Sequence, residues 1–259
     1  MRTVITHVKN EELLLPHWIR HHQLLFEHGI IIDYGSTDQT QEIARALAPN
    51  WRFVRSQNLD FNALDNDFEV MLYESQTPGW KIALTVTEFL SVRDLDGLLR
   101  HAAERKIFAL NFPAFLLVDR LVDEDQPLRL DVPLVHQRYF GLDEPPQNGR
   151  FMLRRMLHCY KHGAYTPGRH ASFRGVPALS QAGVITKFQW SPWGTKYLGR
   201  KTQIAKEVPK EDLVVGRGSH HLRSEEDLKA EINDMRKEAR NLLDTPIYRA
   251  AVGSMRFSS

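Results

Sequence analysis

The stretch IIIDYGSTDQT, residues 30–40, decides the fold class of this chain. An apolar run that ends in Asp33 is followed by a turn of small residues and then by a helical pattern that Asp38 can cap. The pattern predicts a strand, a tight turn and the start of a helix. The free N–H groups of such a helix start can receive a nucleotide or its phosphates. An ordinary connection capped by Ser36 or Asp38 would account for the same residues.

The same alternation continues on both sides of this stretch. Apolar runs indicate strands at residues 4–8, 30–32, 51–56 and 80–84, and helical spacing joins them at residues 13–25, 39–48 and 65–76. Strands that alternate with helices predict an α/β fold with a mixed, mostly parallel sheet flanked by helices. In such sheets ligands bind beyond the carboxyl ends of the strands, so polar residues at those ends are the candidates for function.

The second half of the chain is patterned less regularly. We expect helices at residues 95–104, 150–159 and 224–243, a strand or strand pair at 106–118, and loops over 119–150. Ser224 caps the last of these helices, and Asp227 lies at its third helical position. The expected organisation is one domain over residues 1–243, which ends in this helix, followed by a C-terminal tail over residues 244–259.

The composition excludes several classes of protein. The chain of 259 residues has 34 Lys and Arg against 32 Asp and Glu, and a net charge of +2 gives no electrostatic reason to expect nucleic acid as a partner. Cys159 is the only cysteine, which excludes an internal disulfide and a cysteine-based zinc cluster and fits a reducing compartment, so the cytoplasm is the expected location. The chain opens without a signal-peptide pattern, and the apolar stretch 107–118 is too short to span a bilayer. Membrane contact is therefore expected to be peripheral at most.

A second informative stretch is GWKIALTVTEFLS, residues 79–91. Pro78 and Gly79 end the preceding helix, and the continuous apolar run WKIAL indicates a strand buried on both faces. This strand would deliver Thr85, Thr87 and Glu88 to the edge of the sheet where ligands bind.

Four ordered segments resemble the family 2-like glycosyltransferases, particularly the branch related to family 92. Residues 8–40, VKNEELLLPHWIRHHQLLFEHGIIIDYGSTDQT, are similar to its opening pattern of Lys-Asn-Glu, then Trp, then His before Gly, then Asp-Asn-Gly-Ser-Thr-Asp, with Tyr34 in place of the usual Asn. Residues 78–90, PGWKIALTVTEFL, resemble the family's segment of Gly-Trp, an apolar strand and Asp-X-Asp-Glu-Phe-Leu. RYFG at 138–141 resembles its aromatic-Phe-Gly element, and HHLRSEEDLKAEI at 220–232 resembles the family's C-terminal segment. The resemblance covers roughly residues 4–230.

The resemblance implies a GT-A fold and an inverting transferase. Such an enzyme moves a sugar from a nucleotide-diphosphate donor, here expected to be a UDP-sugar, to a glycan or other hydroxyl acceptor. Carried over by position, the loop of Lys9, Asn10 and Glu11 would contact the base and ribose together with Asp33. Ser36 and Asp38 would support that site.

The departure from the family lies at the Asp-X-Asp element, which is Thr85-Val86-Thr87 in this chain. The family's carboxylates bind Mn²⁺ or Mg²⁺, and a divalent cation is the cofactor that the resemblance implies. Threonine hydroxyls are neutral and poor ligands for such a cation, so a metal site would need Glu88 and His221. The negative charge that grows on the leaving diphosphate can instead be met by basic side chains. The candidates are Lys187, Lys196, Arg200, Lys201 and Arg217, and the alternative for these residues is a solvated basic face.

A general base must also take the proton of the acceptor hydroxyl. Asp143 and Glu144, just after RYFG, are the first candidates, and Glu88 and His136 follow. Two rival interpretations remain open at this point. One is a degenerate transferase that binds a nucleotide or glycan without turnover, and the other is an α/β nucleotide-binding protein of another kind.

Overall fold

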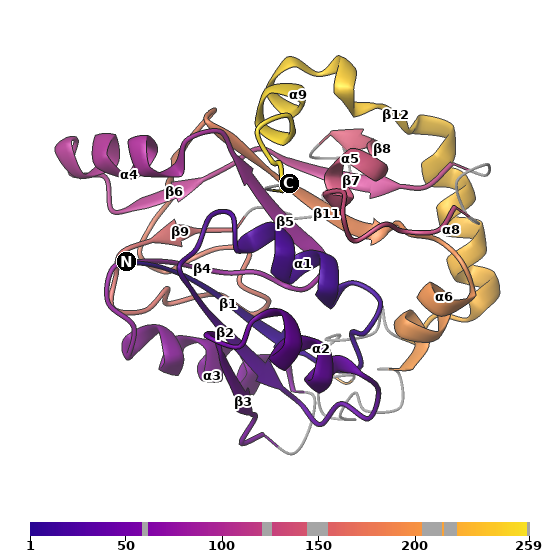
Figure 1. Ribbon diagram of the computed structural model, residues 1–259, viewed down its shortest axis with the longest axis horizontal. Coiled ribbons are helices and arrows are strands. Elements are labelled where there is room, and N and C mark those ends of the chain that lie inside the picture. Colours follow the sequence, from indigo (N-terminus) through magenta and orange to yellow (C-terminus); the bar gives the residue numbers. More distant parts are fainter. Residues whose placement is uncertain (59–61, 121–125, 144–154, 204–213, 215–221, 258–259) are drawn as a thin grey trace.

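The computed structural model describes residues 1–58, 62–120, 126–143, 155–203, 214 and 222–257, and it contains two sheets (Figure 1). The expected fold class is confirmed, because the larger sheet is mixed, mostly parallel and flanked by helices.

The seven-stranded sheet has the order β10-β6-β9-β4-β1-β2-β3. Its parallel pairs are β1 with β2, β1 with β4, β2 with β3 and β10 with β6, whereas β9 is antiparallel to both β4 and β6. The strands are β1 (Arg2–Val8), β2 (His28–Asp33), β3 (Arg52–Arg55), β4 (Trp80–Ala83), β6 (Ala109–Asn111), β9 (Leu157–His158) and β10 (Ala178–Leu179).

Alternating side chains of β1 bury against different layers, as the period of two in a strand requires. Val4 and Val8 belong to the large core that includes α1 (Leu15–His22) and α2 (Thr40–Leu47). Ile5 belongs to a smaller core with Val70 of α3 (Ala63–Ser75). The sheet is therefore covered on both faces, which explains the continuous apolar character of its strands.

The five-stranded sheet has the order β12-β8-β7-β11-β5. Its strands are β5 (Glu88–Val92), β7 (Ala114–Val118), β8 (Phe140–Asp143), β11 (Gly183–Trp190) and β12 (Arg240–Asn241). The chain also forms α4 (Leu95–Glu104), α5 (Leu134–Gln137), α6 (Thr195–Thr202) and α8 (Glu225–Glu238). Of these, α8 packs on β7 and β8. The chain passes from the first sheet to the second between β4 and β5, so residues 84–87 bridge the two sheets.

The C-terminal part of the chain packs onto the second sheet. Ser224 and Asp227 form the predicted capping box of α8, and Leu228 and Ile232 of that helix are buried. Residues 244–259, which the sequence sets apart as a tail, contain the helix α9 (Pro246–Val252) after a short 3₁₀ turn (Leu242–Asp244). Tyr248 of α9 is fully buried.

The helix predicted over residues 150–159 is wrong in its described part, because residues 155–159 are extended and include β9. The short apolar run there fits a buried strand as well as a helix, and its pairing with β4 and β6 decides the outcome. The loops predicted over 119–150 are interrupted by α5 and β8. In the part of the chain that the structure describes, no helix is long and apolar enough to cross a bilayer.

Candidate functional site

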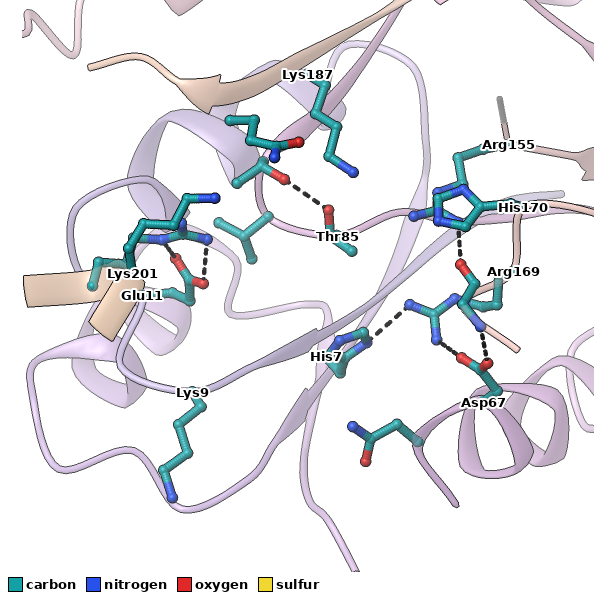
Figure 2. A pocket seen from close by; sticks show the side chains of 16 residues that line it. His7, Lys9, Glu11, Asp67, Thr85, Arg155, Arg169, His170, Lys187 and Lys201 are labelled. Atoms are coloured by element: carbon teal, nitrogen blue, oxygen red, sulfur yellow. Dashed lines mark hydrogen bonds and ion pairs between the residues drawn. The ribbon is translucent and has the colours of Figure 1, made fainter. Parts of the chain in front are cut away.

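A cavity of about 310 Å³ opens beyond the carboxyl ends of β1 and β4 (Figure 2). From β1 the sheet continues to β2 and β3 on one side and to β4 on the other. The crevice between β1 and β4 is therefore a topological switch point, where open α/β sheets bind their ligands. The lining residues are His7, Lys9, Glu11, Asn66, Asp67, Thr85, Val86, Thr87, Arg155, Gly168, Arg169, His170, Lys187, Gln189, Arg200 and Lys201.

Thr85 and Thr87 face each other at the cavity wall. Their Oγ1 atoms lie 2.9 Å apart and form a hydrogen bond. Each hydroxyl thus has a partner within the pair, where the family pattern would place two carboxylates. This part of the wall is polar and neutral.

Glu88 lies behind the threonines as a fully buried anion. Its carboxylate accepts two hydrogen bonds of 2.8 Å from the Arg155 guanidinium, lies 3.3 Å from the Lys187 Nζ and accepts a 2.9 Å bond from the Thr85 backbone N–H. Burial alone would raise the pKa of Glu88, but Arg155 and Lys187 hold it well below its usual range. Glu88 is outside the cavity lining and is fully engaged as the counter-ion of two cations that line it.

A second wall of the cavity joins α6 to the loop after β1. The Glu11 carboxylate accepts two 2.6 Å hydrogen bonds from the Arg200 guanidinium, and the Glu11 backbone N–H donates to the Thr40 Oγ1 at 2.7 Å. The Lys201 Nζ lies 5.0 Å from the centre of the Trp190 ring, a cation–π distance. Burial, followed by the neighbouring Arg200, keeps the pKa of Lys201 well below its usual range. This wall therefore brings two basic side chains close together, and one of them is paired with Glu11.

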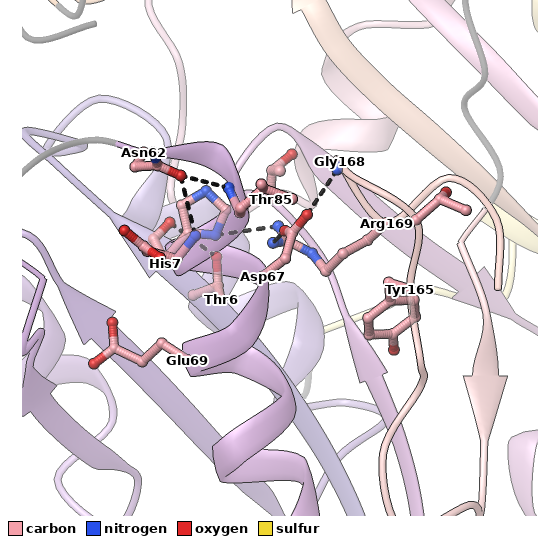
Figure 3. A network of polar contacts seen from close by, with 12 residues as sticks. Thr6, His7, Asn62, Asp67, Glu69, Thr85, Tyr165, Gly168 and Arg169 are labelled. Atoms are coloured by element: carbon pink, nitrogen blue, oxygen red, sulfur yellow. Dashed lines mark hydrogen bonds and ion pairs between the residues drawn. The ribbon is translucent and has the colours of Figure 1, made fainter. Parts of the chain in front are cut away.

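The opposite wall is a polar network from α3 and the loop after β9 (Figure 3). Asp67 forms an ion pair with Arg169 and accepts a 2.7 Å hydrogen bond from the Gly168 backbone N–H. Arg169 also reaches the Nδ1 atom of His7 at 3.1 Å. Burial and Arg169 lower the pKa of His7 to about 3, so its ring is neutral near pH 7 and Nδ1 accepts this bond.

His170 follows Arg169 and also lines the cavity. Burial first, and then the charges of Arg155 and Lys187, lower the pKa of His170 to about 3. Its Nδ1 atom is buried and has no hydrogen-bond partner among the residues that the structure describes. His170 is therefore a neutral imidazole whose hydrogen-bonding capacity is partly unused.

The predicted nucleoside-binding residues hold two loops together. The Asn10 backbone N–H donates to the Ser36 Oγ at 2.9 Å, and the Glu12 backbone N–H donates to Asp38 at 3.0 Å. Asp33 accepts a 3.0 Å bond from the Ser36 backbone N–H. Of the predicted set, Lys9 and Glu11 line the cavity, whereas Asn10, Asp33, Ser36 and Asp38 lie outside its lining and shape the loops next to it.

The remaining predicted residues fall elsewhere. Asp143 forms an exposed ion pair with Arg240 on the second sheet and does not line the cavity. The His136 Nε2 atom lies 2.7 Å from the Val252 carbonyl oxygen, against α9. Glu144 and His221 lie outside the described residues, as does Arg217.

The described residues do not fit a hard divalent cation at the threonine pair. The two hydroxyls are neutral, and the carboxylate next to them, Glu88, is held by Arg155 and Lys187. Over the described ranges, no three His, Cys, Asp or Glu side chains are grouped as metal ligands. The implied Mn²⁺ or Mg²⁺ therefore has no set of protein ligands within this part of the chain.

One side of the cavity was not predicted from the sequence; it is formed by Asp67, Arg155, Arg169 and His170. Asp67 and Arg155 lie within predicted helices, and Arg169 and His170 belong to a region without a recognised motif. The Pro167-Gly168 pair was the available sequence signal, because it marks a turn. In the structure Arg169 follows this pair with a positive φ of 61°, which is uncommon for a residue with a side chain.

No protein-family model and no curated protein matches the sequence. Among solved structures, the chain is similar to glucosyl-3-phosphoglycerate synthase from Mycobacterium tuberculosis in complex with phosphoglyceric acid, at 16% identity and a TM-score of 0.31 over 45% of this chain and 44% of that one. A complex of the same synthase with Mn²⁺, UDP-glucose and phosphoglyceric acid gives 16% identity and a TM-score of 0.32 over 49% of this chain and 47% of the synthase. S. aureus TarS, residues 1–349, gives 11% identity and a TM-score of 0.41 over 95% of this chain and 72% of the TarS chain. The chain thus spans less than half of the synthase, and a likeness this distant assigns no activity.

Proposed function

We propose that the cavity binds the diphosphate of a nucleotide sugar, expected to be a UDP-sugar, and that the protein transfers the sugar to a hydroxyl group of a glycan or other acceptor. The observation that carries the proposal is the position of the cations. Lys187, Arg200 and Lys201 line a cavity at the switch point of the sheet, beside two threonines that replace carboxylates.

The cations supply what the reaction demands of the site. In a single displacement, the acceptor oxygen bonds to the anomeric carbon while the bond from that carbon to the diphosphate breaks, which inverts the anomeric centre. Negative charge grows on the departing diphosphate, and positive groups fixed in advance stabilise it. Lys187 and Lys201 meet this charge directly, while Glu88 and Glu11 hold Arg155 and Arg200 in place. The donor site is therefore metal-independent in this proposal.

His170 is the group that accepts the proton of the acceptor hydroxyl. The carboxylates of Glu11 and Asp67, which line the cavity, are already paired with arginines. His170 is neutral, and its low pKa arises partly from Arg155 and Lys187. A bound diphosphate offsets those two charges and makes the imidazole more basic, so the base becomes effective once the donor is present.

A second candidate function is binding without turnover. It is favoured by the same ion pairs, because they occupy the acidic side chains that a transferase would use as a base. Incubation with UDP-sugars separates the two. Release of UDP, by transfer or by slow hydrolysis, supports a transferase, whereas binding with no release under any condition supports the degenerate form.

The experiment that tests the proposal is a thermal-shift panel of UDP-, GDP-, TDP- and CMP-sugars, each with Mn²⁺ and with EDTA, since a ligand of the native state raises its stability. We expect a shift with UDP-sugars that survives EDTA. Lys187→Ala should weaken binding by about tenfold or more, as loss of a charged contact does. Lys237→Ala is the matched control, because Lys237 is an exposed lysine of α8 paired with Asp234. Equal loss in both variants would refute the assignment.

The role of His170 is tested separately from donor binding. His170→Gln should retain UDP affinity and lower the rate of UDP release by about a hundredfold, a typical contribution of a general base. His28→Gln, at the exposed amino end of β2, should leave both unchanged. An unchanged rate of UDP release in His170→Gln would exclude this residue as the base, and the proposed donor site would still stand.

A further inference from the structure

A group of apolar side chains is exposed at the β10 edge of the seven-stranded sheet, away from the cavity. Phe108, Phe173, Val176 and Leu179 expose 54%, 79%, 96% and 48% of their surface. We refer to these four residues as the edge patch. Single exposed apolar residues are ordinary, but a contiguous group marks a surface that meets another molecule or a membrane.

Contacts between three chain segments hold the edge patch together. The Phe108 ring lies 6.5 Å from the ring of Tyr160, and the Arg174 guanidinium lies 4.9 Å from the same ring. Arg174 also donates a 2.9 Å hydrogen bond to the His162 carbonyl. Phe108, Tyr160, Arg174 and Val176 line one shallow hollow of about 210 Å³. Phe108 and Val176 therefore share one hollow, and Phe173 and Leu179 directly adjoin its lining residues Arg174 and Ala178 in the sequence.

The surroundings of the edge patch are strongly basic. Residues 104–108, 159–162 and 173–179 contain four exposed cations, Arg105, Lys106, Lys161 and Arg174, against a single acid, Glu104. The whole chain, by contrast, is nearly neutral at +2. Positive charge is therefore concentrated around this group of apolar side chains.

A second exposed apolar pair offers an internal comparison. Phe68 and Leu72 of α3 expose 62% and 55% of their surface. That helix has no basic residue, and of its four acids only Asp65 is exposed, since Asp67, Glu69 and Glu74 are buried. The two surfaces match in apolar character, but α3 has none of the exposed cations that its counterpart, the edge patch, has nearby.

We propose that the edge patch docks the protein on an anionic lipid surface. Phe173 and Val176 would enter the boundary between headgroups and acyl chains, and Lys106 and Arg174 would meet the lipid phosphates. Val176 is suited to this role, because its side chain, between Gly175 and Pro177, is almost fully exposed. This contact is peripheral and needs no spanning helix.

The docked orientation leaves the cavity open. β4 and β6 are both antiparallel to β9, so they point in one direction, and Phe108 precedes β6 at its amino end. The cavity lies beyond the carboxyl ends of β1 and β4. Lipid binding and nucleotide binding therefore use opposite ends of the sheet, and this inference does not rest on the proposed function.

Co-sedimentation with vesicles tests the inference. The intact protein should bind phosphatidylglycerol vesicles in preference to phosphatidylcholine vesicles, and raised ionic strength should weaken that binding. Lys106→Gln combined with Arg174→Gln should lower the affinity for phosphatidylglycerol by about thirtyfold. Phe173→Ser combined with Val176→Ser should lower it by about tenfold or more.

Phe68→Ser combined with Leu72→Ser is the matched control and should leave vesicle binding unchanged. Circular dichroism spectra that match the wild type verify that each variant folds. No preference for phosphatidylglycerol, or equal losses in the control and in the edge-patch variants, would overturn the inference. Self-association in sedimentation velocity that disappears in the Phe173 and Val176 variant would assign the patch to a second copy of the chain and would also overturn it.

Discussion

Replacement of Glu88 by glutamine should destabilise the protein far more than a surface substitution does. Glu88 is fully buried and accepts two 2.8 Å hydrogen bonds from Arg155, with the Lys187 Nζ at 3.3 Å. Glutamine keeps the shape but removes the charge, so two cations lose their counter-ion. Its amide N–H₂ also replaces one of the two acceptors that face the guanidinium. Breaking a buried ion pair by removing one partner costs about 3–5 kcal/mol, and we expect Glu88→Gln to lower the free energy of unfolding by that amount at neutral pH.

The pH dependence of this loss follows from the pKa of Glu88. The folded protein holds this pKa well below the usual value of 4.5, so the charged carboxylate contributes stability that is complete above that value. The contribution falls as the pH drops below the usual value toward the folded pKa. The difference between wild type and Glu88→Gln should therefore be largest at neutral pH and should shrink in acid.

Urea unfolding followed by tryptophan fluorescence measures the effect, with linear extrapolation to water. Glu225→Gln is the control, because Glu225 forms an exposed pair with Lys229 on α8. That pair should contribute less than about 1 kcal/mol. A loss below about 1 kcal/mol in Glu88→Gln at neutral pH would refute the role of Glu88 as the buried counter-ion.

Three further predictions concern the cavity and the C-terminal helix. Thr85→Asp combined with Thr87→Asp should weaken UDP binding in EDTA by about tenfold or more, because two carboxylates would face the diphosphate; unchanged affinity in calorimetry would place the diphosphate elsewhere. The pKa values of Lys187 and Lys201 are lowered, first by burial and then by neighbouring cations, and an anionic ligand would raise both. UDP binding should therefore take up protons and weaken as the pH rises toward the usual lysine pKa, and titrations in buffers of different ionisation enthalpy that show no uptake would contradict this. Tyr248→Ala should lower the free energy of unfolding by about 3–5 kcal/mol in urea, as loss of a buried aromatic ring does, and a negligible change would mean that α9 packs only loosely.

The first half of the fold follows from local patterns in the sequence. The spacing of apolar residues from Val4 to Ala83 predicts the strands and helices, because a period of two residues indicates a strand and a period of 3.6 residues indicates a helix with one buried face. The capping box of Ser224 and Asp227 marks the start of α8 for the same local reason. Local patterns do not predict which strands pair with each other, because pairing depends on residues far away in the chain. Residues 106–118 are predicted as a strand or strand pair, but their two strands join different sheets, β6 in the first and β7 in the second.

The candidate site likewise contains residues that local patterns predict and residues that only distant contacts bring together. The stretches around Glu11 and Thr85 carry recognisable patterns at strand ends, so the sequence locates one side of the cavity. The other side depends on the loop after β9, which brings Arg169 within reach of Asp67 across 102 residues of sequence. The partnership of Glu88 with Arg155 is equally non-local, which is why Glu88 was expected in the site as a general base or a metal ligand rather than as a buried counter-ion.

The most direct test of the metal-independent donor site is calorimetric titration of the wild-type protein with UDP, once in EDTA and once in Mn²⁺. We expect binding in EDTA with the same Kd as in Mn²⁺, because Lys187, Arg200 and Lys201 supply the positive charge in the complex. Binding that appears only with Mn²⁺ would contradict it and would show that ligands outside the described cavity wall hold a metal ion.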